Sequence, residues 1–162
     1  MAIKLVIGDF NKSSWSLRAW LVLAAAGIEV SLEQVLLERD DTRANILAWS
    51  PSGKLPVLID GELTINDSLA IAEYAADLHP EADLWPEDFD LRAMARAAAA
   101  EMHSGFVNLR TQMSFGLNTG DHCETLWDAT REEIARILQI WTDLRTRSGH
   151  GTYPVSYTHL RA

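Results

Sequence analysis

The sequence predicts an α/β domain joined to an all-α domain. Up to about residue 78, short apolar runs that are typical of strands alternate with segments whose apolar residues fall at helical spacing. The stretch HPEADLWP at residues 79–86 has a proline near each end, which is typical of a linker, and only helical patterns follow it. We therefore expect an α/β domain at 1–79, a linker at 80–86 and a partial helical domain at 87–152.

The elements of the first domain are predicted from apolar periodicity and turn signals. Strands are expected at residues 3–8, 29–36, 56–59 and 62–65, and helices at residues 17–24, 40–49 and 68–75. The run IKLVIG is typical of a buried strand, whereas EVSLEQVL alternates apolar and polar residues as a half-buried strand does. The first two strands flank a helix, which indicates a βαβ unit, and Asp60-Gly61 predicts a tight hairpin between the last two.

The helices are predicted to bury apolar stripes. The polar turn NKSS offers N-caps for the first helix and Gly27 ends it; its stripe is Leu17, Trp20, Leu21 and Ala24. The second domain is expected to hold one long helix over residues 88 to about 115 and another over 124–147. The stripe of this last helix is Leu126, Ile134, Ile137, Leu138 and Trp141.

The end of the chain does not fit this pattern. Two helices enclose little core by themselves, and residues 153–162 (YPVSYTHLRA) show no period. Two interpretations stay open: a truncated reading frame with a non-native tail, or an ordinary disordered terminus. In the truncated case the last helix lacks packing partners, and we expect the isolated chain to aggregate or dimerise.

Composition excludes several classes of protein. The net charge is −9 and Lys and Arg are not clustered, which argues against a nucleic-acid partner. The one cysteine, Cys123, excludes an internal disulfide framework and a CxxC redox pair, and it is interpreted as an incidental thiol. There is no charged-then-apolar leader pattern and no apolar run long enough for a bilayer, so we expect a cytoplasmic protein with no membrane partner.

Two segments carry a resemblance to a known family: NKSSWSLRAWLVLAAAGI, and SPSGKLPVLIDGELTINDSLAIAEYAADLHPEADLWP. Together they resemble bacterial serine-type glutathione S-transferases related to the zeta class, over about residues 3–115. The resemblance implies a thioredoxin-like glutathione-binding domain followed by a helical domain for the electrophile, incomplete in this chain. It also implies glutathione as co-substrate, no metal, a role in detoxification and, at full length, a cytoplasmic homodimer.

The resemblance identifies Ser13 and Ser14 as candidate catalytic residues, with Ser13 favoured. A thiol with a pKa near 8.5 is mostly protonated at neutral pH, and a hydroxyl donor at a helix N-terminus favours its thiolate. Either serine is also explained as a plain N-cap. Trp15 stands where the zeta class has cysteine, which weakens the case for maleylacetoacetate isomerase activity and removes any glutaredoxin-like nucleophile.

The glutathione-binding residues implied by the resemblance follow the first helix at a distance. They are Lys54, Leu55, Pro56, Asp67 and Ser68. In the thioredoxin-like fold the proline is cis, and the backbone of the residue before it pairs with the cysteinyl part of glutathione. Asp67 and Ser68 are helix-cap residues that would also receive the γ-glutamyl ammonium and carboxylate. Lys54 is a candidate partner of a glutathione carboxylate, or simply an exposed loop lysine.

The substrate pocket is expected to use Trp15 together with side chains of the long helix. Spacings of three, four and seven residues place His103, Phe106 and Arg110 on one helical face. The resemblance implies that Phe106 lines an apolar pocket and that Arg110 binds an acidic or polarised group. A structural role is the alternative for each of them.

The sequence therefore predicts a glutathione transferase that conjugates the glutathione thiolate to a small electrophile. Three alternatives stay open: a glutathione-dependent isomerase or peroxidase of the same fold, a non-catalytic glutathione-binding module, and a fragment that is inactive as written.

Overall fold

The computed structural model describes residues 2–117 and 125–149. The chain divides into two compact units. The first comprises Met1–Ala82 and Phe115–Asn118, and the second comprises Asp83–Ser114 and Thr119–Ala162. The expected tail at 153–162 and Cys123 lie outside the described residues.

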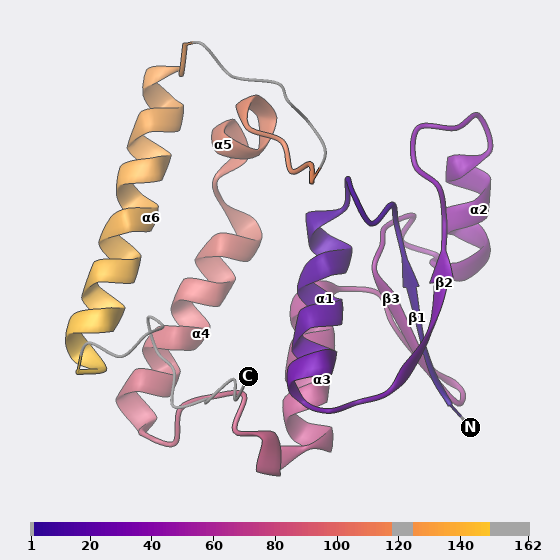
Figure 1. Ribbon diagram of the computed structural model, residues 1–162, viewed down its shortest axis with the longest axis horizontal. Coiled ribbons are helices and arrows are strands. Elements are labelled where there is room, and N and C mark those ends of the chain that lie inside the picture. The colour runs from indigo at the N-terminus through magenta and orange to yellow at the C-terminus, as the bar shows by residue number, and fades with distance from the viewer. Residues whose placement is uncertain (1, 118–124, 150–162) are drawn as a thin grey trace. The chain divides into compact units, whose positions relative to one another are not determined.

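The first unit is built on a four-stranded mixed sheet with the order β2-β1-β3-β4 (Figure 1). Its strands are β1 (Ile3–Ile7), β2 (Val30–Gln34), β3 (Val57–Asp60) and β4 (Leu63–Ile65). β1 runs parallel to β2 and antiparallel to β3, and β3 and β4 form an antiparallel hairpin. The turn of that hairpin contains Gly61 at a φ of 59°, a conformation that glycine adopts without steric cost. The predicted βαβ unit and hairpin are therefore confirmed.

Helices cover both faces of this sheet. They are α1 (Ser14–Ala25), α2 (Thr42–Trp49) and α3 (Ser68–Leu78), and a short 3-10 turn, Pro80–Ala82, follows α3. α1 and α3 pack together on one side of the strands and α2 lies on the other (Figure 1). Val6 and Val57 form a cluster with Val35, against which Ile46 and Trp49 of α2 pack. This is the thioredoxin-like arrangement that the resemblance implies.

The buried face of α1 differs from the predicted one. Ser16, Ala19 and Leu23 are the buried residues of this helix, whereas Trp20 and Leu21 of the expected stripe are exposed. α1 carries apolar side chains on more than one face, so the periodicity alone does not identify the buried one, and α3 is the helix that packs against it. The strand β2 differs too, because it is a sheet edge: Leu32 is 42% exposed where a half-buried strand was expected.

The second unit is helical, with α4 (Phe89–Ser104), α5 (Val107–Gln112) and α6 (Asp128–Arg147). The predicted continuous helix over 88–115 is wrong, because the chain breaks after Ser104. A β-carbon at Gly105 would lie 2.9 Å from the carbonyl oxygen of Glu101, and Phe106 adopts a left-handed conformation with a φ of 61°. Among the described residues, no helix combines the length and apolar character needed to cross a membrane.

A carboxylate from α6 caps the start of α5. Glu133 accepts the backbone N–H groups of Asn108 and Leu109, at 3.2 and 2.7 Å, and the side-chain amide of Asn108 at 2.8 Å. Burial raises the pKa of Glu133, but these hydrogen bonds outweigh it, so the pKa lies below its ordinary value. The cap satisfies donors that the break in the helix would otherwise leave unpaired.

The core of the helical unit lies between α4, the Phe106 break and α6. Phe106, Ile137, Ile140 and Leu144 form its buried cluster. Of the predicted α6 stripe only Ile137 is buried, while Leu138 and Trp141 are 54% and 49% exposed. α6 therefore presents an apolar face that the described residues do not cover.

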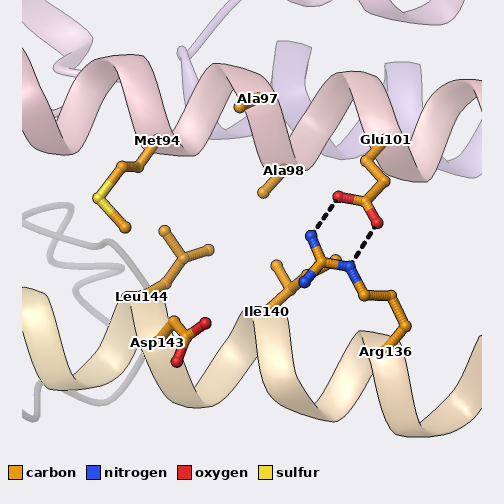
Figure 2. Close-up of a pocket in the computed structure, with 8 residues that line it drawn as sticks. All are labelled: Met94, Ala97, Ala98, Glu101, Arg136, Ile140, Asp143 and Leu144. Atoms are coloured by element: carbon orange, nitrogen blue, oxygen red, sulfur yellow. Dashed lines mark hydrogen bonds and ion pairs between the residues drawn. The ribbon is translucent and has the colours of Figure 1, made fainter.

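An ion pair links α4 to α6 beside this core. Arg136 donates Nε and Nη2 to the two carboxylate oxygens of Glu101, at 2.7 and 2.8 Å (Figure 2). The pair borders a cavity of about 170 Å³. Ala98 points toward α6 across this cavity (Figure 2), and Ala97 also lines it; their short side chains leave it unfilled.

Acid should weaken the helical unit through Glu101. Hydrogen bonds from Arg136, and then its charge, hold the pKa of Glu101 below the ordinary value. A lowered folded-state pKa stabilises the fold above the unfolded-state value of about 4.3, and this stabilisation is lost as pH falls through the folded-state pKa. Glu101→Gln removes the titrating group, so the parent should melt higher than the variant at neutral pH and the gap should close below about pH 4.

The control is Glu132→Gln, which removes an exposed carboxylate of α6 in place of the α4 carboxylate of Glu101. Thermal unfolding followed by circular dichroism at each pH measures both variants against the parent. A gap for Glu101→Gln that stays constant from neutral to acid pH would contradict this role of the ion pair.

Candidate functional site

The loop between β1 and α1 is held by backbone hydrogen bonds around Asp9. The carbonyl oxygen of Asp9 accepts the N–H groups of Lys12 and Ser13, at 3.1 and 2.9 Å. Its carboxylate accepts the N–H of Leu37 at 2.9 Å, which ties the loop to the segment after β2. Lys12 also forms an ion pair with Glu38 in that segment. These contacts determine where Ser13 lies.

Ser13 is the N-cap of α1 and is joined to a second serine. Its Oγ accepts the N–H of Ser16 at 3.3 Å and its hydroxyl donates to Ser16 Oγ at 2.8 Å. Ser16 Oγ also accepts the N–H of Gly8 at 3.0 Å, and Ser16 is only 3% exposed. A β-carbon at Gly8 would lie 3.1 Å from Ser13 Cβ, so a residue without a side chain allows this close approach.

Ser14 and Trp15 begin α1 beside this pair. Ser14 is half-buried, and no hydrogen bond of its side chain is recorded within residues 2–117 and 125–149. The Trp15 ring lies 4.5 Å from the guanidinium of Arg18, at the distance of a cation–π contact. First-turn N–H groups at the N-terminus of a helix favour a negative charge, and no acidic side chain in the first turn of α1 offsets that preference.

A mostly apolar cavity of about 160 Å³ adjoins Ser13 and Ser16 within the first unit. Its lining residues are Ile7, Phe10, Ser13, Ser16, Leu17, Trp20 and Leu117. Leu117 belongs to the segment of the first unit that comes late in the chain, and its N–H donates to the carbonyl oxygen of Asn11 at 3.2 Å. Hydrogen bonds beside such apolar surroundings are stronger than in water.

The proline turn precedes β3. The Leu55-Pro56 peptide bond is cis, as the resemblance implies, and Pro56 is buried. The ladder between β1 and β3 pairs residues 57–59 of β3, so Leu55 lies outside it. Lys54 is exposed, and its own N–H bonds to Ser52 Oγ at 3.3 Å.

The start of α3 carries an ordinary cap and one unusual hydroxyl. Asp67 is the N-cap: its Oδ1 accepts the N–H groups of Leu69 and Ala70 at 2.8 and 3.0 Å. These two N–H groups belong to the first turn of α3, where the γ-glutamyl carboxylate is expected. Asp67 therefore already occupies part of the hydrogen-bonding capacity of that turn. Ser68 is 2% exposed, and its Oγ is a buried side-chain oxygen for which no hydrogen-bond partner is recorded among the described residues.

The substrate-pocket residues of the helical unit are not on one continuous helical face. His103 lies in the last turn of α4, Phe106 at the break and Arg110 on α5. Phe106 belongs to the buried core of its unit, and Arg110 donates to the carbonyl oxygens of Met102 and Gly105. The three side chains would share one face only on an unbroken helix, and the helix is broken at Gly105. Substrate roles for His103, Phe106 and Arg110 remain predictions.

The sequence-based prediction missed the residues that hold Ser13 in place, namely Gly8, Asp9 and Ser16. The spacing of Ser13 and Ser16 is that of a capping box, with serine in place of the usual glutamate or glutamine, and this signal was available. Asp9 and Gly8 carried no such signal, because their partners lie far along the chain or are backbone atoms. Among the described residues, no group of His, Cys, Asp or Glu is arranged to hold a metal ion.

The sequence of residues 12–78 matches the family model described as "Glutathione S-transferase, N-terminal domain". Glutathione S-transferase Z2 of Arabidopsis thaliana is 34% identical over 103 residues, covering 63% of this chain and 46% of that protein. A probable maleylacetoacetate isomerase of Caenorhabditis elegans is 33% identical over 107 residues, covering 65% of this chain and 50% of that protein. The chain thus spans about half the length of the curated relatives it matches.

Solved structures agree with the fold. A glutathione transferase homologue from Burkholderia, with bound glutathione, has a TM-score of 0.67 and 25% identity and covers 88% of this chain and 67% of that one. A glutathione S-transferase from the Antarctic clam Laternula elliptica has a TM-score of 0.67 at 19% identity, covering 96% of this chain and 72% of that one. The fold is therefore a thioredoxin-like domain with a helical domain, and the matched part of the sequence is similar to glutathione S-transferases that include zeta-class members.

The cap at Asp67 should contribute to stability independently of any ligand. Asp67→Ala removes the acceptor of the Leu69 and Ala70 N–H groups and should cost about 0.5–2 kcal/mol of unfolding free energy. Asp67→Asn keeps a good N-cap and should stay close to the parent. Urea denaturation measures both variants, and an equal loss in the two would mean that the carboxylate charge, not the cap, is responsible.

Proposed function

We propose that this chain, a relative of the zeta-class glutathione transferases, binds glutathione and transfers its thiolate to a small electrophile. One observation carries the proposal. The glutathione S-transferase N-terminal domain match covers residues 12–78, and every predicted thiol-activating and glutathione-binding residue falls within it. These residues are Ser13, Ser14, Lys54, Leu55, Pro56, Asp67 and Ser68.

The thiol end of glutathione would lie at the start of α1. A free thiol is mostly protonated at neutral pH, so a transferase has to favour the thiolate. The start of α1 supports this role in two ways: it offers the serine hydroxyls as donors, and its N-terminus favours negative charge. The apolar cavity beside Ser13 and Ser16 limits competition from water.

The γ-glutamyl end would lie at the start of α3. Among residues 2–117 and 125–149, the buried Ser68 hydroxyl has no hydrogen-bond partner, and a buried hydroxyl that finds no hydrogen bond is unfavourable. A ligand carboxylate would accept its proton and take advantage of the helix N-terminus. Because Asp67 already occupies two N–H groups of that turn, the ligand would depend strongly on Ser68.

The middle of the tripeptide would lie against the proline turn. Leu55 is outside the β1–β3 ladder, so its backbone is not needed by the sheet and an extended peptide has a strand-like partner there. Lys54 in the same loop is exposed and offers a cation to a ligand carboxylate. The helical unit would contribute the electrophile site of the whole protein.

A glutathione-dependent isomerase is the second candidate. It is favoured by relatives named as maleylacetoacetate isomerases, at 33% and 32% identity, in Caenorhabditis elegans and Rattus norvegicus. Trp15 at the position of the zeta-class cysteine argues against it, because an indole offers the substrate no second sulfur. Conversion of maleylacetoacetate by this chain would favour the isomerase over the transferase.

Removing the thiol activator should raise the thiol pKa of bound glutathione. We expect Ser13→Ala to raise it by about one unit, because a hydrogen bond to a charged acceptor is worth about 1.5–3 kcal/mol. The ultraviolet absorbance of the thiolate follows the titration, with Ser14→Ala measured in parallel. If both variants titrate like the parent, a serine hydroxyl is not the activator.

Replacing Ser68 should weaken glutathione binding without lowering the stability of the fold. Ser68→Ala removes a buried hydroxyl that lacks a partner within the described part of the chain, so the unfolding free energy should stay equal or rise. The same change should weaken glutathione binding roughly tenfold, because the ligand carboxylate loses a donor. Calorimetric titration with glutathione and urea denaturation give the two quantities. Unchanged affinity would overturn the placement of the γ-glutamyl group.

A further inference from the structure

The hydrogen bonding of Ser16 is unusual for a helix residue. Its hydroxyl lies inside the first unit, and it bridges the last backbone N–H before the loop, that of Gly8, to the side chain of Ser13. A polar residue at this position of α1, facing the sheet with 3% exposure, displaces an apolar side chain that the core would accept.

The protons of the two hydroxyls limit what Ser13 can do. A serine hydroxyl has one proton and two lone pairs. In this structure Ser13 gives its proton to Ser16 Oγ, while Ser16 Oγ accepts from both Ser13 and Gly8. Within the part of the chain that the structure describes, the proton of Ser16 itself has no recorded acceptor in this arrangement. Ser13 therefore has no proton left for a ligand, and Ser16 has an unused one.

Reversing the hydrogen bond between the two serines makes the Ser13 proton available to a ligand and gives the Ser16 proton an acceptor. If Ser16 donates to Ser13 Oγ, the Ser16 proton finds an acceptor and the Ser13 proton turns toward the ligand side. The bond from the Gly8 N–H to Ser16 Oγ is kept in both arrangements. In the reversal both O–H bonds rotate and the two oxygens, 2.8 Å apart in this structure, stay hydrogen-bonded, so no proton changes its owner.

We propose that Ser16 is a positioning residue for the thiol activator: it accepts the Ser13 proton in the free protein and donates to Ser13 when a thiolate is bound. This inference rests on the proposed function. Ser16 does not touch the sulfur. It acts through Ser13: the Ser16 hydroxyl donates a hydrogen bond to Ser13 Oγ, which leaves the Ser13 proton available to the thiolate. Two hydroxyls that donate in series form a stronger hydrogen bond to the thiolate than one hydroxyl alone.

A purely structural role is the competing explanation, since Ser16 also satisfies the N–H of Gly8. The two explanations differ in their dependence on Ser13. A structural role affects the loop whether or not Ser13 carries a hydroxyl. A positioning role disappears when the Ser13 hydroxyl is absent, so a double-mutant cycle separates them.

The experiment titrates the thiol of glutathione bound to this chain by its ultraviolet absorbance. We expect Ser16→Ala to raise the thiol pKa by about 0.5–1 unit, which is a threefold to tenfold smaller thiolate-to-thiol ratio below that pKa. In the Ser13→Ala background the same change should have no further effect. Ser16→Thr, which keeps a hydroxyl, should titrate like the parent.

Steady-state kinetics with chlorodinitrobenzene as the electrophile give a second readout. Ser16→Ala should lower kcat below the thiol pKa and leave the KM for glutathione close to that of the parent. Ser31→Ala, which removes an exposed hydroxyl of β2, is the matched control and should change neither quantity. If Ser16→Ala does not fold, Ser16→Cys carries the same expectation, because a thiol is a weak donor of similar size.

The outcomes are distinguishable. An unchanged thiol pKa in Ser16→Ala overturns the inference, and so does an equal rise in the parent and Ser13→Ala backgrounds, which indicates a structural role. A rise in Ser14→Ala in place of Ser13→Ala also overturns it. If the parent chain does not lower the thiol pKa of glutathione at all, the proposed function fails and this inference fails with it.

Discussion

The hydrogen bond from the N–H of Gly8 to Ser16 Oγ connects the end of the central strand β1 to the first turn of α1. The sheet places Gly8, since β1 pairs with both β2 and β3. The helix places Ser16, which is buried against the sheet. The loop between them is thereby held at both ends, and Asp9 bonds it to Leu37 as well. Ser13 lies at the end of this loop, so the geometry of the candidate thiol site depends on this contact together with the hydrogen bonds of Asp9.

The topology of the first unit could be predicted from sequence because each of its elements has a local signal. The Asp60-Gly61 turn, the apolar run of β1 and the cap residues before α3 act over a few residues, and all were placed correctly. The buried faces of the helices could not be predicted in this way. α1 is apolar on more than one side, and only the packing of the folded unit, in which Ser16 and Ala19 are buried, decides which side faces inward.

The helical unit shows the same division between local and distant causes. Gly105 was a local signal for the end of a helix, yet the alanine-rich pattern around it favoured continuation. Phe106 adopts a left-handed conformation at the break, and the cap of α5 depends on Glu133, which lies on another helix. The sequence places Arg110 within helical reach of His103, but the structure gives its guanidinium to backbone carbonyls at the break. The hydrogen-bond partners of Arg110 result from the break in the helix, and the sequence spacing of Arg110 and His103 does not predict them.

Glutathione is proposed to bind to the first unit along the starts of α1 and α3. Chemical-shift mapping of backbone amides in a nitrogen-15-labelled sample of this chain tests it most directly, with glutathione as the titrant. If glutathione binds there, we expect saturable shifts concentrated at Gly8, at Ser13 to Ser16, at Leu55 and at Ser68 to Ala70. An absence of saturable shifts, or shifts confined to α4 and α6, would contradict it.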